Sequence, residues 1–218
     1  MNIAFASHCQ QGLRDENQDR TGVILDARKA CFVVCDGVAG LPGGDQAAQL
    51  VCDVLIEQLQ DCEQVTPAVT HQAVEKCRSI LEMAQGNNPN FSTMCTTLAG
   101  LFIDRTRQRA WWAHAGDSRV YHFRHGVLNE VTRDHSLAQK LSDAGYENTG
   151  INSNLLYNAL GIEPAHPVTF ADEILLEDGD AFLVCSDGFW LNLTTTEMEQ
   201  ALRMVNDCDE WLTLMAQA

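Results

Sequence analysis

Positive charge is scarce in this 218-residue chain, which has 14 Lys and Arg residues against 30 Asp and Glu residues and a formal net charge of −16. A negative field of this size repels nucleic acid and anionic membrane surfaces, so we expect neither as a partner. It also repels phosphorylated substrates unless bound cations offset it locally.

The chain also has little that points to a membrane or to secretion. No segment approaches the ~18 consecutive apolar residues of a membrane-spanning helix, and residues 1–12 lack the features of a signal peptide. The nine cysteines are scattered singly without a CxxC pair, which is typical of reduced thiols and argues against a disulfide framework or a zinc site. We therefore expect a cytoplasmic protein with a single domain, residues 1–218.

The apolar periodicity predicts an α+β domain. Alternating or short apolar runs predict strands at 2–7, 20–26, 30–35, in a meander between 94 and 132, and in a pair around the Asp178-Gly179 turn. Helical spacing and capping patterns predict helices at 45–60 with Asp45 as the cap, at 67–85 and 137–144, and from Thr194 and Asp207 onward. Strands mixed with segregated helices favour helices packed on sheet faces.

Three aspartates stand at the ends of apolar runs: Asp36 in "CFVVCDG", Asp117 in "AHAGDSR" and Asp187 in "AFLVCSDG". A strand carries each carboxylate to the rim of a sheet, and such rims brought together make an oxygen site for Mg²⁺ or Mn²⁺. Gly37 permits a sharp turn and leaves its carbonyl free as a further ligand. Taken singly, each aspartate is better explained as a turn or cap residue; it is the joint pattern that favours a metal site.

The charged run "RDENQD" at 14–19 has two interpretations. It is either a solvated loop or a phosphate-binding segment in which Arg14 contacts the phosphate, because a guanidinium group matches phosphate oxygens. In the second interpretation, Asp19 holds or orients a metal-bound water. Asp134 and His135 are expected to have structural roles, and Trp111 and Trp112 to be one core and one surface position of a strand.

Read in order, these segments resemble the metal-dependent Ser/Thr protein phosphatases of the type 2C or PPM class, and most closely their compact bacterial branch. The matching segments, over residues 8–190, are "GLRDENQD", "VVCDGVAGLPGGDQAA", "TTLAGLF", "AHAGDSRVYHFRHGVLNEVTRDHS", "NALG" and "GDAFLVCSDGFW". Each alone is weak, but the ordered set is specific. The resemblance implies a β-sandwich of two antiparallel sheets flanked by helices on both outer faces, a four-layer αββα fold.

The resemblance also implies a metal centre at one end of the sandwich, holding two Mn²⁺ or Mg²⁺ ions. Asp36 would bridge the two ions, with the Gly37 carbonyl and Asp187 as further ligands. Asp117 would serve an additional, weaker third site. The polar stretch 145–158 falls where the family has a variable flap that contacts substrate.

The implied activity is hydrolysis of phosphoserine and phosphothreonine in proteins, opposing a Ser/Thr kinase. Arg14 would hold the substrate phosphate, and Asp19 would hydrogen-bond a metal-bound water that attacks phosphorus directly, so no cysteine nucleophile is needed. The expected partners are a phosphoprotein substrate and a cognate kinase, and we expect the protein to be a monomer.

Two departures from the family pattern leave an alternative open. The family ends with a strand whose aspartate ligates a metal, whereas this chain ends at "DCDEWLTLMAQA", and Leu191 stands where many relatives have an aspartate for the additional metal. Either the natural protein lacks that last strand or this chain is a truncation, and in both cases we expect a domain without the strand and with weaker metal affinity. The alternative is a catalytically impaired phosphatase-like domain that binds or regulates a phosphoprotein partner. A phosphatase acting in a signalling switch is a third possibility, which the sequence does not separate from the first.

Overall fold

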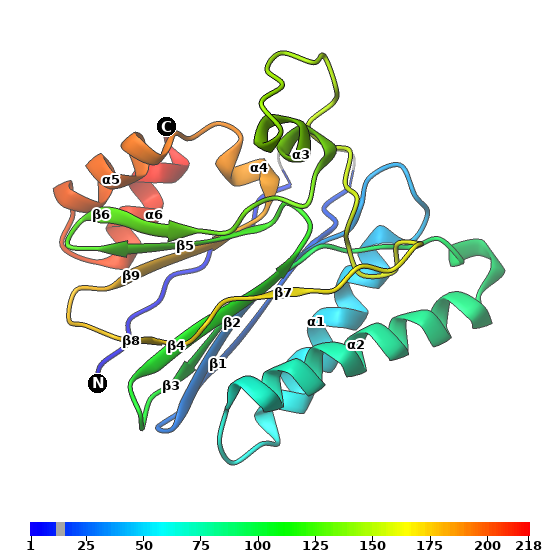
Figure 1. Ribbon diagram of the computed structural model, residues 1–218. Helices are drawn as coiled ribbons and strands as arrows, with labels where there is room; N and C mark the ends of the chain where they lie inside the picture. The colour runs from blue at the N-terminus through cyan, green and yellow to red at the C-terminus, as the bar shows by residue number, and fades with distance from the viewer. Residues whose placement is uncertain (12–15) are drawn as a thin grey trace.

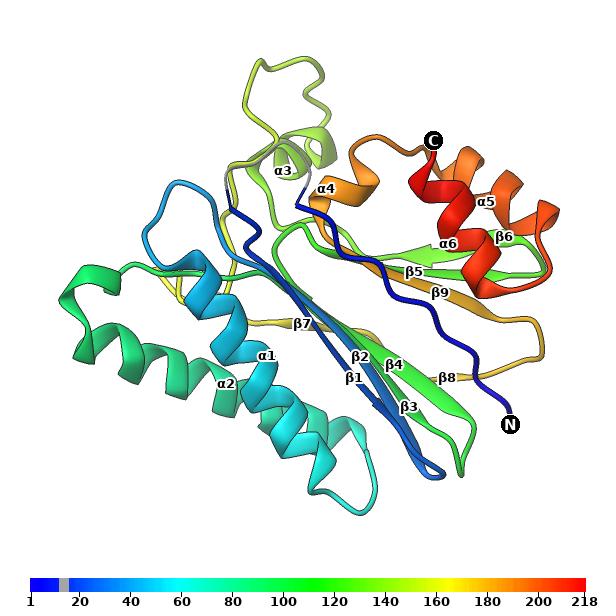
Figure 2. The same cartoon turned by 180° about the vertical axis from the view of Figure 1, so that it is seen from behind.

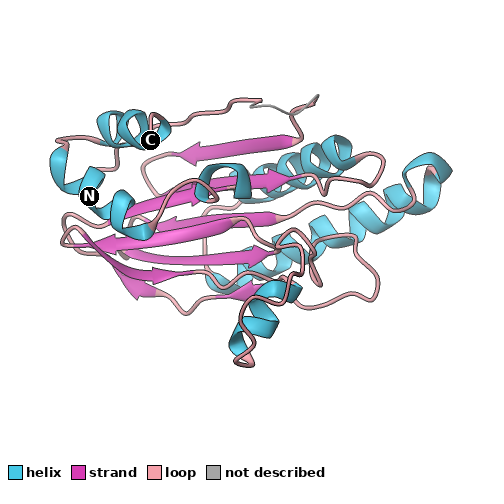
Figure 3. Cartoon of the chain, turned by 90° about the horizontal axis from the view of Figure 1, so that it is seen from above, coloured by secondary structure: helices cyan, strands magenta, loops and turns pink. Residues whose placement is uncertain are grey.

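Two antiparallel sheets pack face to face, and helices cover both outer faces (Figure 1). The computed structural model describes residues 1–11 and 16–218. Seen from above, helices flank the strands (Figure 3). The α+β sandwich expected from the sequence is therefore confirmed.

The larger sheet has the strand order β1-β2-β3-β4-β7, with β8 also paired to β4, and the smaller sheet has the order β6-β5-β9. The strands of the larger sheet are β1 (Asp19–Leu25), β2 (Lys29–Asp36), β3 (Leu98–Asp104), β4 (Arg109–Ala115), β7 (Thr169–Phe170) and β8 (Ile174–Leu175). Those of the smaller sheet are β5 (Arg119–Arg124), β6 (Val127–Val131) and β9 (Ala181–Cys185). The α-helices are α1 (Gly44–Gln60), α2 (Pro67–Asn87), α3 (Leu137–Asp143), α4 (Asp187–Trp190), α5 (Thr195–Met204) and α6 (Cys208–Ala216).

Three apolar layers hold the four layers of secondary structure together. Helices α1 and α2 pack on the outer face of the larger sheet, where Phe102 and Trp111 point. Leu101 and Trp112 point the other way, into the layer between the sheets. Alternate residues of a strand face opposite sides, so strands covered on both sides read as continuous apolar runs. Both tryptophans are therefore buried, and the expectation of one surface tryptophan is wrong.

The third layer lies between the smaller sheet and the C-terminal helices. Tyr121 and Phe123 from β5 pack against Met198 of α5 and against Trp211 of α6. The capping patterns behind these two helices are confirmed: Thr194 forms a capping box with Glu197, and the Asp207 side chain accepts the Glu210 N–H.

Four local predictions are wrong. Residues 94–132 do not form one meander, because the chain leaves the larger sheet after β4 and enters the smaller sheet at β5. The segments around Asp178-Gly179 likewise separate, since β8 pairs with β4 and β9 pairs with β5. Residues 2–7 are not a strand. Gly43 is the N-cap of α1, and Asp45 lies in its first turn without capping it.

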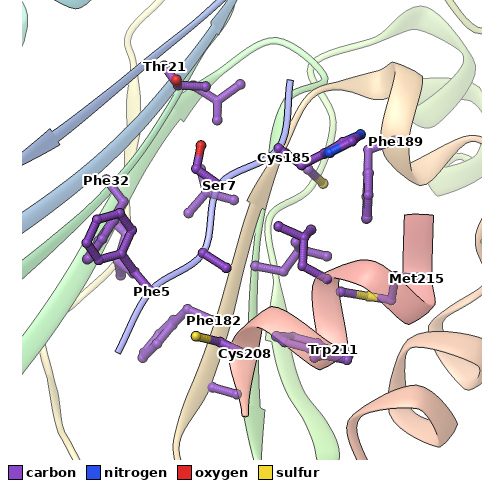
Figure 4. Close-up of a pocket in the computed structure, with 18 of the residues that line it drawn as sticks. Phe5, Ser7, Thr21, Phe32, Phe182, Cys185, Phe189, Cys208, Trp211 and Met215 are labelled. Carbon is purple, nitrogen blue, oxygen red and sulfur yellow. The ribbon is translucent and has the colours of Figure 1, made fainter. Parts of the chain in front are cut away.

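An open groove of about 1270 Å³ lies between the sheets on the side of β1 and β9. Residues 1–11 of the N-terminal segment line this groove, and Figure 2 shows from behind the course of that segment past the larger sheet. In Figure 4, Phe5 lies against Phe32 of the larger sheet, with ring centroids 5.7 Å apart, and Trp211 lines the opposite side. The groove extends to Asp19 and Asp187, so it opens directly onto the predicted site.

Two further findings concern the chain as a whole. All nine cysteines are free thiols, as their scattered positions predicted. Within the described residues, none of the helices combines the length and the apolar character that crossing a bilayer requires.

Candidate metal centre

Strand register brings Asp19 and Asp36 together. In the antiparallel pair of β1 and β2, Asp19 lies directly opposite Asp36, and opposed residues project from the same face of a sheet. Asp187 reaches the same place from the other sheet, because it begins α4 directly after β9. Asp36 is 5% exposed and Asp187 is 6% exposed. Three of the predicted site residues therefore gather where the two sheets meet.

Asp36 lies in an unfavourable environment for an isolated carboxylate. Burial, together with the charge and hydrogen bonding of the neighbouring Asp19 and Asp187 carboxyl groups, raises the pKa of Asp36 to about 10. Oδ1 of Asp36 is buried and accepts no hydrogen bond from the described residues. A buried carboxylate beside like charges needs either a proton or a cation. This oxygen-rich site therefore fits a hard divalent cation.

Asp19 is held in place from the opposite sheet. The Ser186 hydroxyl donates a hydrogen bond to Oδ2 of Asp19 at 2.8 Å. Ser186 is the residue before Asp187, so a single turn after β9 both delivers one carboxylate and orients another. Arg14, the predicted phosphate-binding residue, lies outside the described residues.

Gly37 is required by packing. A Cβ atom at this position would lie 2.3 Å from the Gly44 carbonyl carbon and oxygen, at the start of α1. Any side chain here would push α1 away from the end of β2. The Gly37 N–H donates to the Gln18 carbonyl at 3.1 Å, which ties the two strand ends together. The role of the Gly37 carbonyl as a ligand stays a prediction.

Asp117 lies in the tight connection from β4 to β5. Gly116 adopts φ +103°, a conformation that favours glycine, and so turns the chain between the sheets. Burial, together with the charges of Asp187 and Asp134, raises the pKa of Asp117 to about 7. The Trp190 indole N–H donates to the Asp117 carbonyl at 2.8 Å. Asp117 thus belongs to the same electrostatic cluster as Asp187.

Asp134 and His135 form hydrogen bonds with residues in or directly after the turn between β4 and β5. Arg119 makes two hydrogen bonds to the Asp134 carboxylate, at 2.8 and 2.7 Å, so its carboxylate partner is Asp134 and not Asp117, two residues before it in sequence. Burial lowers the pKa of His135 to about 4, with His114 as a further cause. The neutral ring can therefore accept the Gly116 N–H at Nδ1, at 3.1 Å. Both residues have the structural roles that the sequence predicted.

The carboxylates do not form a finished metal site on their own. Within residues 1–11 and 16–218, no three His, Cys, Asp or Glu side chains are arranged to hold a metal ion. A cation bound beside Asp36 would need further oxygen donors, for which a backbone carbonyl and water are suitable.

Several polar residues at this site were not singled out from the sequence, although they lie within the segments that carry the family resemblance. They are Thr97, Ser118, Ser186 and Trp190, and each lies close to one of the aspartates in the fold. Only Ser118, Ser186 and Trp190 are near an aspartate in sequence. That proximity could have identified these three, whereas Thr97 reaches Asp36 only through strand pairing.

Comparison with known proteins decides the family. The family model described as protein phosphatase 2C matches residues 6–217. This chain belongs to the protein phosphatase 2C family. The resemblance noted from the ordered motifs is therefore confirmed. The chain is 27% identical over 203 residues to the serine/threonine phosphatase stp of Listeria monocytogenes, a match that covers 88% of this chain and 79% of that protein.

Solved structures of other phosphatases share this family fold. The catalytic domain of the serine/threonine protein phosphatase PstP, in complex with two manganese ions, superposes with a TM-score of 0.79 at 27% identity, covering 94% of this chain and 85% of that chain. The serine/threonine phosphatase Stp1 of Staphylococcus aureus superposes with a TM-score of 0.85 at 20% identity, covering 96% of this chain and 85% of that chain. At 20% identity, the similarity to Stp1 supports the fold alone.

Proposed function

We propose that this member of the protein phosphatase 2C family hydrolyses phosphoserine and phosphothreonine in proteins with Mn²⁺ or Mg²⁺, and so opposes a Ser/Thr kinase. The observation that carries the proposal is Asp36. Its carboxyl group is buried between those of Asp19 and Asp187, its pKa is raised to about 10, and one of its oxygens accepts no hydrogen bond from the described residues. The manganese-bound PstP relative supports a metal-based interpretation of that carboxylate.

In this proposal, Asp36, Asp187 and the Gly37 carbonyl would hold the metal ions, and Asp117 would serve a weaker third site. A divalent metal ion supplies Lewis acidity there, since it lowers the pKa of water and offsets the charge of a phosphate ester. Asp19, oriented by the Ser186 hydroxyl, would accept a hydrogen bond from the attacking water. Arg14 would bind the phosphate of the substrate.

The thiols near the site do not provide an alternative nucleophile. Cys185 is two residues before Asp187, and burial raises its pKa well above its usual range. The reactive form of cysteine is the thiolate, which this environment disfavours. The raised pKa of Cys185 therefore supports water, and not this thiol, as the nucleophile of the proposed reaction.

The proposal is tested by measuring hydrolysis of a phosphothreonine peptide with and without millimolar Mn²⁺. We expect turnover only with the metal. In Asp187→Asn we expect turnover to fall by about 100-fold or more, because the metal would lose its ligand from the smaller sheet. Equal turnover without metal, or wild-type turnover in Asp187→Asn, would contradict the proposal.

A second candidate function rests on the incomplete set of carboxylates. Because no three such side chains in the described part of the chain are arranged to hold a metal, a catalytically impaired domain that binds a phosphoprotein is the alternative. It predicts that a phosphothreonine peptide binds without turnover at saturating Mn²⁺. Clear turnover in the same assay removes this alternative.

A further inference from the structure

Two buried hydroxyl groups connect the strand end that carries Asp36 to the turn that carries Asp117. The Thr97 Oγ1 and Ser118 Oγ atoms are 2.6 Å apart. Thr97 is 2% exposed and Ser118 is fully buried, at 0%. A hydrogen bond between two such hydroxyls has no competition from water, so its geometry is well defined.

Thr97 also forms hydrogen bonds with both backbone polar groups of Asp36, its N–H and its carbonyl. The Asp36 N–H donates to Oγ1 of Thr97 at 3.0 Å, and the Thr97 N–H donates to the Asp36 carbonyl at 2.8 Å. A hydroxyl group has one donor and two acceptor positions. The Thr97 hydroxyl therefore uses one acceptor position for Asp36 and joins Ser118 with what remains.

This arrangement spans the two sheets. Asp36 ends β2 in the larger sheet, and Ser118 is the residue immediately before β5 in the smaller sheet. The path from Asp36 through Thr97 to Ser118 and its neighbour Asp117 consists only of the hydrogen bonds described above and one peptide bond. A change in either hydroxyl would let the two aspartates move relative to one another.

We propose that Thr97 and Ser118 are positioning residues of the metal centre, and that their hydroxyl pair sets the spacing between the Asp36 and Asp117 carboxylates. The inference rests on the proposed function, because only that function assigns both Asp36 and Asp117 to one metal centre. Groups that orient metal ligands in this way typically contribute 10–100-fold to metal affinity.

The chain offers a matched control in Thr70. Its side chain is fully buried, accepts the Trp111 indole N–H at 2.9 Å and donates to the Pro67 carbonyl at 2.9 Å. Thr70 lies in α2, on the outer face of the larger sheet. Removing its hydroxyl leaves a buried donor unpaired, as removing the Thr97 hydroxyl does, but at a position outside the metal centre.

The test is isothermal titration of Mn²⁺ alone into metal-free protein, with the thermal midpoint measured on the same samples. The variants are Thr97→Val, which keeps the branched shape and loses the hydroxyl, Thr97→Ser, which restores it, and Thr70→Val. We expect Mn²⁺ affinity to fall about 10-fold in Thr97→Val, to stay within about 2-fold of wild type in Thr97→Ser, and to be unchanged in Thr70→Val despite a lower midpoint.

Ser118→Ala tests the other half of the pair and does not depend on Thr97→Val being folded. It should also weaken Mn²⁺ binding, and the double variant should bind no more weakly than Thr97→Val, because coupled groups are not additive. Wild-type affinity in Ser118→Ala, or in folded Thr97→Val, would overturn this inference and leave the proposed function standing. A wild-type chain that does not bind Mn²⁺ would overturn both.

Discussion

Replacing Asp36 with asparagine is expected to lower kcat for a phosphothreonine peptide by at least about 10³-fold at saturating Mn²⁺, which corresponds to about 4 kcal/mol. Asparagine has nearly the same shape but no negative charge, so it would lose the attraction to the metal ions that the proposal places beside Asp36, where Asp36 lies near Asp19 and Asp187. The measurement is steady-state kinetics at several Mn²⁺ concentrations. This variant should show the largest loss of activity of any single substitution proposed for the described residues.

The control for this variant is Asp45→Asn. Asp45 follows Asp36 in the same glycine-rich segment, but it lies in the first turn of α1 and makes no cap. We expect wild-type kinetics from it. If Asp36→Asn kept kcat within about 3-fold of wild type, the assignment of Asp36 as the central ligand would be wrong.

Mn²⁺ is expected to raise the thermal midpoint of the protein by more at pH 8.5 than at pH 5.5. In the metal-free fold, burial and neighbouring carboxyl groups together raise the pKa of Asp36 from 3.8 to about 10, and that of Asp117 from 3.8 to about 7. The folded state therefore binds protons that the unfolded state has released, so these groups stabilise the fold at low pH. That stability is lost as pH rises from about 4 toward 10 for Asp36, and from about 4 toward 7 for Asp117.

Metal binding reverses this loss, because it needs the ionised carboxylates. At 100 times its dissociation constant, a ligand adds about 2.7 kcal/mol at one site, which is about 5–10 °C in the midpoint for a chain of this size. Thermal scans with Mn²⁺ and with a chelator, at both pH values, measure the difference. The same increase at both pH values would show that the metal does not replace protons on these carboxylates.

Metal-free Asp36→Asn provides the matching control. At pH 8.5 it should unfold at the wild-type temperature or higher, since the substitution removes a buried carboxyl group that lies beside two others. Its midpoint should also depend less on pH than that of the wild type. A large destabilisation would mean that Asp36 has a structural role that the metal does not explain.

The sequence predicted those parts of the fold that depend on local patterns. The helices at α1 and α2 follow from apolar spacing, and the start of α5 follows from the Thr194 and Glu197 capping box. The three aspartates were found because each ends an apolar run, and the ordered motifs identified the family. These patterns could be recognised in the sequence because the residues that form each of them lie within a few positions of one another.

The errors arose where distant segments decide the structure. No local pattern near Asp178 indicates that β8 and β9 belong to different sheets, because packing across the whole domain determines which strands pair. For the same reason, the sequence did not predict that the chain passes from the larger sheet to the smaller sheet after β4. Thr97 was missed because its bond to Asp36 exists only once β2 and β3 are paired.

The metal-binding role of Asp36 and Asp187 is tested most directly by an anomalous diffraction map at the manganese edge, from crystals grown with Mn²⁺. We expect a peak between the carboxylates of Asp36 and Asp187, within ligand distance of both. A map with manganese only elsewhere, or with none, would contradict the claim that these aspartates form the metal centre.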